Sequence, residues 1–155
     1  MQSLRDASFI EADTIEVVPY PPKSFRMVGQ IGCKGNIILN VDKLLARIDD
    51  GDDPFVQTVM YSYNASIRNG HNIFRYDNQH TRHDHPDSHH KHAFYVRTGD
   101  ELESSPFWIG AAKWPTLGEV LRELMQWHEQ HYDLLAEPET YATPESQSNR
   151  LHLGF

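Results

Sequence analysis

The stretch FVQTVMYSYNASIRNGHNIFRYD, residues 55–77, decides the fold. Two runs rich in β-branched and aromatic residues meet across Asn69-Gly70, a dipeptide that favours a two-residue type I′ turn between antiparallel strands. The cross-strand pairs predicted by such a turn are Ser62–Asp77, Tyr63–Tyr76, Asn64–Arg75, Ala65–Phe74, Ser66–Ile73 and Ile67–Asn72. Because side chains alternate along a strand, one face of this hairpin is aromatic and apolar and the other is polar. The apolar face suits a hydrophobic core.

Further short segments around the hairpin have the composition of strands. They are residues 9–18, 24–31, 35–41 and 91–97, the last with His92, Phe94 and Val96 on one face. Residues 42–54 are predicted to contain a short helical turn followed by an acidic loop.

A helix is predicted after Pro115. Thr116 can cap its first turn while Glu119, at the third helical position, returns a bond to the cap. Apolar residues then recur at helical spacing at Leu117, Val120, Leu121, Leu124 and Met125. Pro138 sets its outer limit.

Strands followed by one main helix indicate an α+β fold. We expect a largely antiparallel β-sheet with a single C-terminal helix packed on one face. Residues 1–138 are predicted to form one domain, and the polar, proline-containing residues 139–155 a loosely held tail. An unpaired edge strand in such a sheet makes a homodimer plausible.

The composition excludes several classes of protein. The chain has 155 residues, and none of its apolar runs approaches the length of about 20 that spans a bilayer. Its first residues lack the pattern of a secretion signal, and a single cysteine, Cys33, fits a reducing compartment. We therefore expect a cytoplasmic protein that is not membrane-bound. The formal net charge of −8 argues against a protein whose whole surface binds nucleic acid.

Most of the candidate chemistry lies in RYDNQHTRHDHPDSHHKH, residues 75–92, which holds six of the ten histidines. With neutral histidines, residues 67–97 are slightly basic, so an anionic ligand could bind there despite the acidic total. Three interpretations are open. The histidines could hold a metal ion, they could transfer protons, or the segment could be a solvated loop without chemistry.

The metal interpretation rests on His83-x-His85 and His90-x-His92, each of which places two imidazoles on one side of an extended backbone. His89 with Asp84 or Asp87 could complete the ligand set, although the spacing matches no standard zinc motif.

The proton-transfer interpretation rests on imidazole, which titrates near neutral pH and can act as both acid and base. Cleavage of RNA requires a base for the 2′-hydroxyl, an acid for the leaving oxygen, and a cation beside the phosphate. His85, His89, His90 and His92 can supply the first two roles, and Arg75 and Lys91 the third. Asp77 can orient an imidazole by accepting its other N–H.

The chain resembles the TumE-like toxins of prokaryotic toxin–antitoxin modules. The resemblance covers about residues 25–130 and rests on YSYNASIRNGHNIFRYDNQH, HPDSHHKHAF and PTLGEVLRELMQW. It is most specific at RYDN (75–78) and HHKH (89–92). The site residues that it points to are Arg75, Asp77, His85, His89, His90, Lys91 and His92.

The resemblance implies the toxin component of a type II module, neutralised by a cognate antitoxin that is often a helix-turn-helix DNA-binding protein. Small toxins of such modules are commonly ribonucleases. Our leading hypothesis is therefore a metal-independent ribonuclease that needs no cofactor. The alternative is a non-catalytic module that binds a metal or a protein through the histidine-rich loop.

Overall fold

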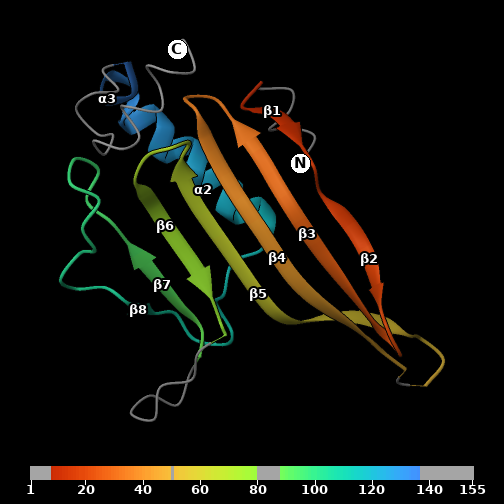
Figure 1. The fold of residues 1–155 in the computed structure, drawn as a ribbon. Coiled ribbons are helices and arrows are strands. Elements are labelled where there is room, and N and C mark those ends of the chain that lie inside the picture. Colours follow the sequence, from red (N-terminus) through yellow and green to blue (C-terminus); the bar gives the residue numbers. More distant parts are fainter. Residues whose placement is uncertain (1–7, 50, 80–87, 137–155) are drawn as a thin grey trace.

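The structure, a computed structural model, describes residues 8–49, 51–79 and 88–136 (Figure 1). Its strands are β1 Ile10–Asp13, β2 Glu16–Tyr20, β3 Ser24–Cys33, β4 Ile37–Ile48, β5 Phe55–Ile67, β6 Asn72–Asp77, β7 His90–Ala93 and β8 Phe107–Trp108. The helices are α2 Leu117–Gln130 and α3 Tyr132–Ala136. The predicted domain limit at residue 138 and the predicted tail 139–155 lie outside the described residues.

All the strands belong to one antiparallel sheet. Its order is β1-β3-β4-β5-β6-β7-β8, and β2 also pairs with β3. The sheet is open, and α2 crosses one of its faces (Figure 1). The predicted α+β fold with a C-terminal helix on an antiparallel sheet is confirmed.

The predicted strand 9–18 is divided into β1 and β2, which both pair with β3. Gly29 of β3 lies beside the junction of β1 and β2, and its φ of 154° is rare for residues with a side chain. A Cβ at this position would lie 2.5 Å from the carbonyl oxygen of Thr14. The outer edge of the sheet therefore bends where only a glycine leaves room for the neighbouring backbone.

The predicted helical turn after residue 41 is wrong, because β4 continues to Ile48. Lys43 pairs with Met27 of β3 on one side and with Tyr61 of β5 on the other. A central strand has both rows of backbone groups bonded to neighbours, and this pairing outweighs the local helix preference of Leu44, Leu45 and Ala46.

The hairpin has the predicted register along most of its length. Ser62–Asp77, Tyr63–Tyr76, Asn64–Arg75 and Ala65–Phe74 are all partners, whereas the pairs Ser66–Ile73 and Ile67–Asn72 are wrong. A bulge after Ala65 pairs Ser66 with Asn72, and the backbone N–H of Ile67 donates to the carbonyl of His71 at 3.0 Å. The loop thus holds three residues, and Asn69 is left-handed (φ 55°) while Gly70 is not.

The strand predicted over 91–97 is also shorter, since β7 ends at Ala93. The chain turns after Tyr95, where the N–H of Gly99 donates to the Tyr95 carbonyl at 2.8 Å. Gly99 has a φ of 77°, which favours glycine. This turn sends residues 100–108 back along β7, where Phe94 bridges to Glu101 and β8 pairs with β7.

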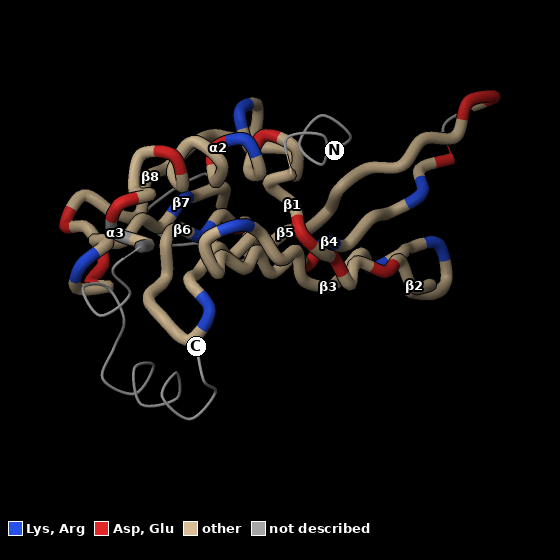
Figure 2. The backbone as a smooth tube through the Cα atoms, turned by 90° about the horizontal axis from the view of Figure 1, so that it is seen from above, with Lys and Arg blue, Asp and Glu red and all other residues tan. Residues whose placement is uncertain are grey.

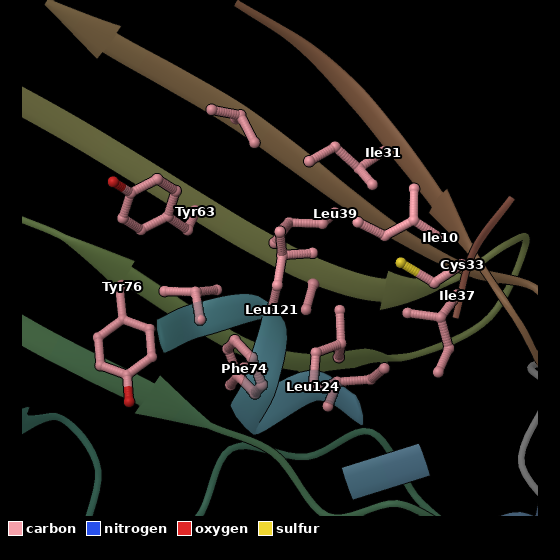
Figure 3. Close-up of a cluster of buried hydrophobic side chains, with 14 of the residues drawn as sticks. Ile10, Ile31, Cys33, Ile37, Leu39, Tyr63, Phe74, Tyr76, Leu121 and Leu124 are labelled. Atoms are coloured by element: carbon pink, nitrogen blue, oxygen red, sulfur yellow. The ribbon is translucent and has the colours of Figure 1, made fainter. Parts of the chain in front are cut away.

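The core lies between α2 and the apolar face of the sheet (Figure 3). The predicted capping box is present: the Thr116 hydroxyl accepts from the Glu119 N–H at 3.3 Å, and the Glu119 carboxylate accepts from the Thr116 N–H at 2.7 Å. The helix residues buried against the sheet are Val120, Leu121 and Leu124. The strands contribute Ile31, Leu39, Val41, Tyr61, Tyr63, Ala65, Phe74 and Tyr76, among others.

The opposite face of the sheet is polar. Register places Gln30, Asn40, Asn64, Arg75 and His92 in one row across five strands. The next row runs through Asp42, Ser62, Asp77, His90 and Trp108. On β6 and β7 the two rows bring together an arginine, an aspartate and two histidines.

Candidate functional site

The pairing of β6 with β7 builds the site. Arg75 lies opposite His92, and Asp77 lies opposite His90. Because side chains alternate, these four point to the polar face of the sheet, whereas Tyr76 and Lys91 between them point toward α2. Local strand geometry therefore collects two imidazoles, a guanidinium and a carboxylate on one face.

Asp77 and His90 form a buried pair, with 2% and 4% of their surfaces exposed. His90 Nε2 lies 3.1 Å from Asp77 Oδ1, and His90 Nδ1 lies 2.7 Å from the backbone carbonyl of Ser88. A carbonyl only accepts, so Nδ1 carries a hydrogen. Nε2 faces the Asp77 carboxylate, and this contact is an ion pair when the ring is protonated. Trp108 covers the ring, with centroids 5.4 Å apart.

Arg75 is the second cation beside Asp77. Its Nε lies 2.9 Å from Asp77 Oδ2, yet its N–H does not point at that oxygen, so the contact is an ion pair and not a hydrogen bond. The Arg75 side chain is 38% exposed. The guanidinium thus reaches from the buried carboxylate toward solvent.

His92 is held differently from His90. Its Nδ1 lies 2.5 Å from Glu101 Oε1, and the Ser105 hydroxyl donates to the same oxygen at 2.6 Å. The hydrogen bonds from Ser105 and then His92 lower the pKa of Glu101, so this group accepts as a carboxylate. Nδ1 of His92 therefore donates, and the lone pair of a neutral ring is left on Nε2. The rings of His90 and His92 stand nearly perpendicular, with centroids 5.0 Å apart.

These side chains line an open pocket with a volume of about 350 Å³. Its walls are Arg75, His90, His92, Glu101, Ser105, Pro106 and Trp108. The first three were expected from the sequence. Glu101, Ser105 and Trp108 were missed, because nothing in residues 94–108 signals that the chain folds back over the histidines.

Lys91 lies on the other side of the sheet. Its ammonium group is bonded to the Glu123 carboxylate of α2 and lies 5.1 Å from the ring centroids of both Phe74 and Tyr76. Tyr76 donates to Glu123 at 2.6 Å. The structure thus separates Arg75 and Lys91, the two cations predicted to lie beside one phosphate, and it makes Lys91 a contact between sheet and helix.

His89 belongs to a second aromatic cluster. Its ring stacks on Tyr61 and Trp114 at centroid distances of 5.6 and 5.8 Å, and its Nδ1 lies 3.0 Å from the Tyr61 hydroxyl. These three residues line a different pocket, together with Asn78. His85 lies outside the described residues. Of the seven predicted site residues, the structure therefore brings together Arg75, Asp77, His90 and His92.

The chain matches the family model described as Toxin TumE over residues 1–132. The chain belongs to the TumE toxin family. This match confirms the resemblance found in the sequence and extends it to the N-terminal strands. No curated protein and no solved structure matches the chain.

Membership of the TumE family makes the protein the toxin component of a toxin–antitoxin system, and its partner is a cognate antitoxin. Among the described residues, no helix of this TumE family member is both long and apolar enough to cross a membrane. The four residues that the structure gathers all lie within the matched range.

Proposed function

We propose that this toxin is a metal-independent ribonuclease whose reaction takes place in the pocket of Arg75, Asp77, His90 and His92. The observation that carries the proposal is that two neighbouring imidazoles have different polar contacts. His92 donates from Nδ1 to Glu101, while both nitrogens of His90 face acceptors. We assign His92 as the group that takes a proton and His90 as the group that gives one.

The reaction that fits this pair is transesterification within RNA. His92 Nε2 removes the proton of a ribose 2′-hydroxyl, and the 2′-oxygen forms a bond to the adjacent phosphorus. The bond from phosphorus to the 5′-oxygen breaks, and the imidazolium of His90 protonates that leaving oxygen. Glu101 stabilises the imidazolium formed at His92, as the acid of a catalytic triad does. The expected products are a 2′,3′-cyclic phosphate and a 5′-hydroxyl.

Arg75 supplies positive charge beside the phosphate. Its guanidinium is anchored on Asp77 and partly exposed, so it can approach the charge that develops on the phosphate oxygens. Asp77 then has a positioning role, since it contacts both Arg75 and His90. This arrangement needs no extended basic surface, and Figure 2 shows acidic and basic residues interspersed along the backbone.

The test uses the purified, untagged full-length protein, total RNA and EDTA, with the ends of the products mapped. Removal of a general base typically costs about 10²- to 10⁴-fold in rate, so His92→Asn is expected to lose at least about 100-fold. His131→Asn is the matched control, since His131 stacks on Trp127 away from the pocket. No cleavage by the wild type in EDTA, or equal cleavage by His92→Asn, would overturn the proposal.

Two more variants separate the residues that the sequence grouped together. Lys91→Gln is expected to keep its rate per folded molecule, because Lys91 contacts Glu123 on the helix side of the sheet. His85→Ala tests the candidate outside the described residues. A loss of cleavage rate in Lys91→Gln as large as that in His92→Asn would indicate that the reaction takes place on the helix side of the sheet.

We further propose that the cognate antitoxin is a helix-turn-helix DNA-binding protein in a type II module, and that the toxin acts in the cytoplasm, where its RNA substrate is. The family assignment supports a partner protein. A second copy could pair with the outer strand β2, whose residues are all exposed. Purification of the toxin with the product of the neighbouring gene, followed by light scattering of the toxin alone and of the complex, tests both the partner and the homodimer.

A further inference from the structure

We propose that Asp77, His90 and His92 form a binding site for a divalent transition-metal ion, zinc above all. Each residue offers one ligand atom, and these atoms all lie within 4.8 Å of one another. Two imidazole nitrogens and one carboxylate oxygen are a donor set that zinc binds in proteins. Two of the three residues are buried and the third is partly buried, so the site is far better enclosed than a cluster of surface acids.

The hydrogen bonds behind the two histidines give independent support. Metal-bound histidines almost always donate their other N–H to a carboxylate or a backbone carbonyl, which orients the ring and selects its tautomer. His90 Nδ1 has the Ser88 carbonyl at 2.7 Å, and His92 Nδ1 has the Glu101 carboxylate at 2.5 Å. Both rings therefore offer Nε2 as the ligand atom. Ser105 in turn fixes Glu101.

The pocket leaves room for further ligands. Its volume of about 350 Å³ can hold water or a small anion next to an ion bound by three protein groups. Arg75, whose Nε lies 2.9 Å from Asp77 Oδ2, places a positive charge near the ion and lowers its affinity. With two nitrogen ligands and only one carboxylate, the site favours zinc over magnesium, which prefers oxygen.

Zinc would also regulate the reaction proposed above, and this consequence rests on the proposed function. An Nε2 lone pair that binds zinc cannot accept a proton from a 2′-hydroxyl, and a zinc-bound His90 has no Nε2 hydrogen to give. Zinc is therefore expected to inhibit RNA cleavage. The binding site itself rests on geometry alone.

The test is titration of ZnCl₂ into the untagged full-length protein, stripped of metal with EDTA and desalted, with binding followed by calorimetry. One tight site per chain is expected, and His92→Ala is expected to weaken it by at least about 100-fold. The double variant His83→Ala, His85→Ala is the control for adventitious binding by the histidine-rich loop and is expected to keep the tight site. No stoichiometric zinc, or loss of the tight site in the loop variant alone, would overturn the proposal.

Glu101→Gln keeps the proposal testable if His92→Ala does not fold. The Glu101 side chain is 41% exposed, so the change is expected to preserve the fold. Glu101 is not one of the three proposed zinc ligands but orients His92, so the change is expected to weaken zinc binding about 10- to 100-fold. Unchanged zinc affinity in a folded Glu101→Gln protein would count against the site. The two measurements test the two proposals separately. Zinc binding without RNA cleavage would refute only the proposed ribonuclease activity, and RNA cleavage without zinc binding would refute only the proposed metal site.

Discussion

Removal of the Asp77 carboxylate is the sharpest test of the buried pair. In Asp77→Ala, His90 Nε2 loses the carboxylate oxygen 3.1 Å away, Arg75 loses its counter-ion at 2.9 Å, and the N–H of Gln79 loses an acceptor at 3.3 Å. Breaking a buried pair by removing one partner costs about 3–5 kcal/mol. Because a histidine, unlike an arginine, has a neutral form that can be buried, we expect the lower end, about 3 kcal/mol.

A free-energy change of about 3 kcal/mol lowers the folding constant by about two powers of ten. For a chain of this length it corresponds to a fall in Tm of about 9 °C. Urea unfolding followed by tryptophan fluorescence suits the measurement, because Trp108 packs against the His90 ring. Asp77→Asn keeps a planar group that can donate to a neutral imidazole, so we expect a smaller loss of about 1 kcal/mol.

Asp42 provides the matched control on the same face. It pairs with Arg26 at 2.7 Å, and register places it beside Ser62, which itself pairs with Asp77. The Arg26–Asp42 pair is exposed, so Asp42→Ala is expected to change stability little. If Asp77→Ala were no more destabilising than Asp42→Ala, burial of the Asp77–His90 pair would have no energetic consequence and the reasoning would be refuted.

Three further predictions concern the core and the pH dependence. Leu121→Ala, at a fully buried position on α2, is expected to cost about 3 kcal/mol in urea unfolding. Tyr63→Phe should leave the unfolding free energy unchanged or raise it by up to about 1 kcal/mol, since the Tyr63 hydroxyl has no partner among the described residues. Tyr76→Phe loses the hydrogen bond to Glu123 and should lower the unfolding free energy. Burial lowers the pKa of His128 below 6.5. The contribution of His128 to stability is therefore present above pH 6.5 and is lost as the pH falls through the folded-state pKa. Unfolding free energies measured between pH 7.5 and 5 should show the difference between wild type and His128→Gln becoming smaller as the pH falls.

Much of the architecture followed from local patterns. Alternation along residues 55–77 predicted which residues of β5 and β6 enter the core, and Tyr63, Ala65, Phe74 and Tyr76 are buried as expected. Register away from the turn was correct, because slipping it by one residue would move the whole aromatic set to the polar face. The capping box at Thr116 was correct because it depends on residues within one helical turn.

The errors arose where distant segments overrule local preference. Residues 42–48 resemble a helix only when considered alone, because pairing with β3 and β5 makes them a strand. The turn after Ile67 holds one residue more than Asn69-Gly70 suggests, since a bulge after Ala65 shifts the end of the hairpin.

The sequence by itself determined that Arg75 shares a face of its strand with Asp77, and His90 with His92, because alternation is a local property of extended backbone. Only the tertiary structure decided which side of β7 faces the helix, and so directed Lys91 to Glu123 and away from Arg75. It also decided that Asp77 and His90 are buried and that Glu101 and Trp108 join the histidines. Burial and contacts between segments depend on the whole packed chain, which composition and spacing along one strand do not describe.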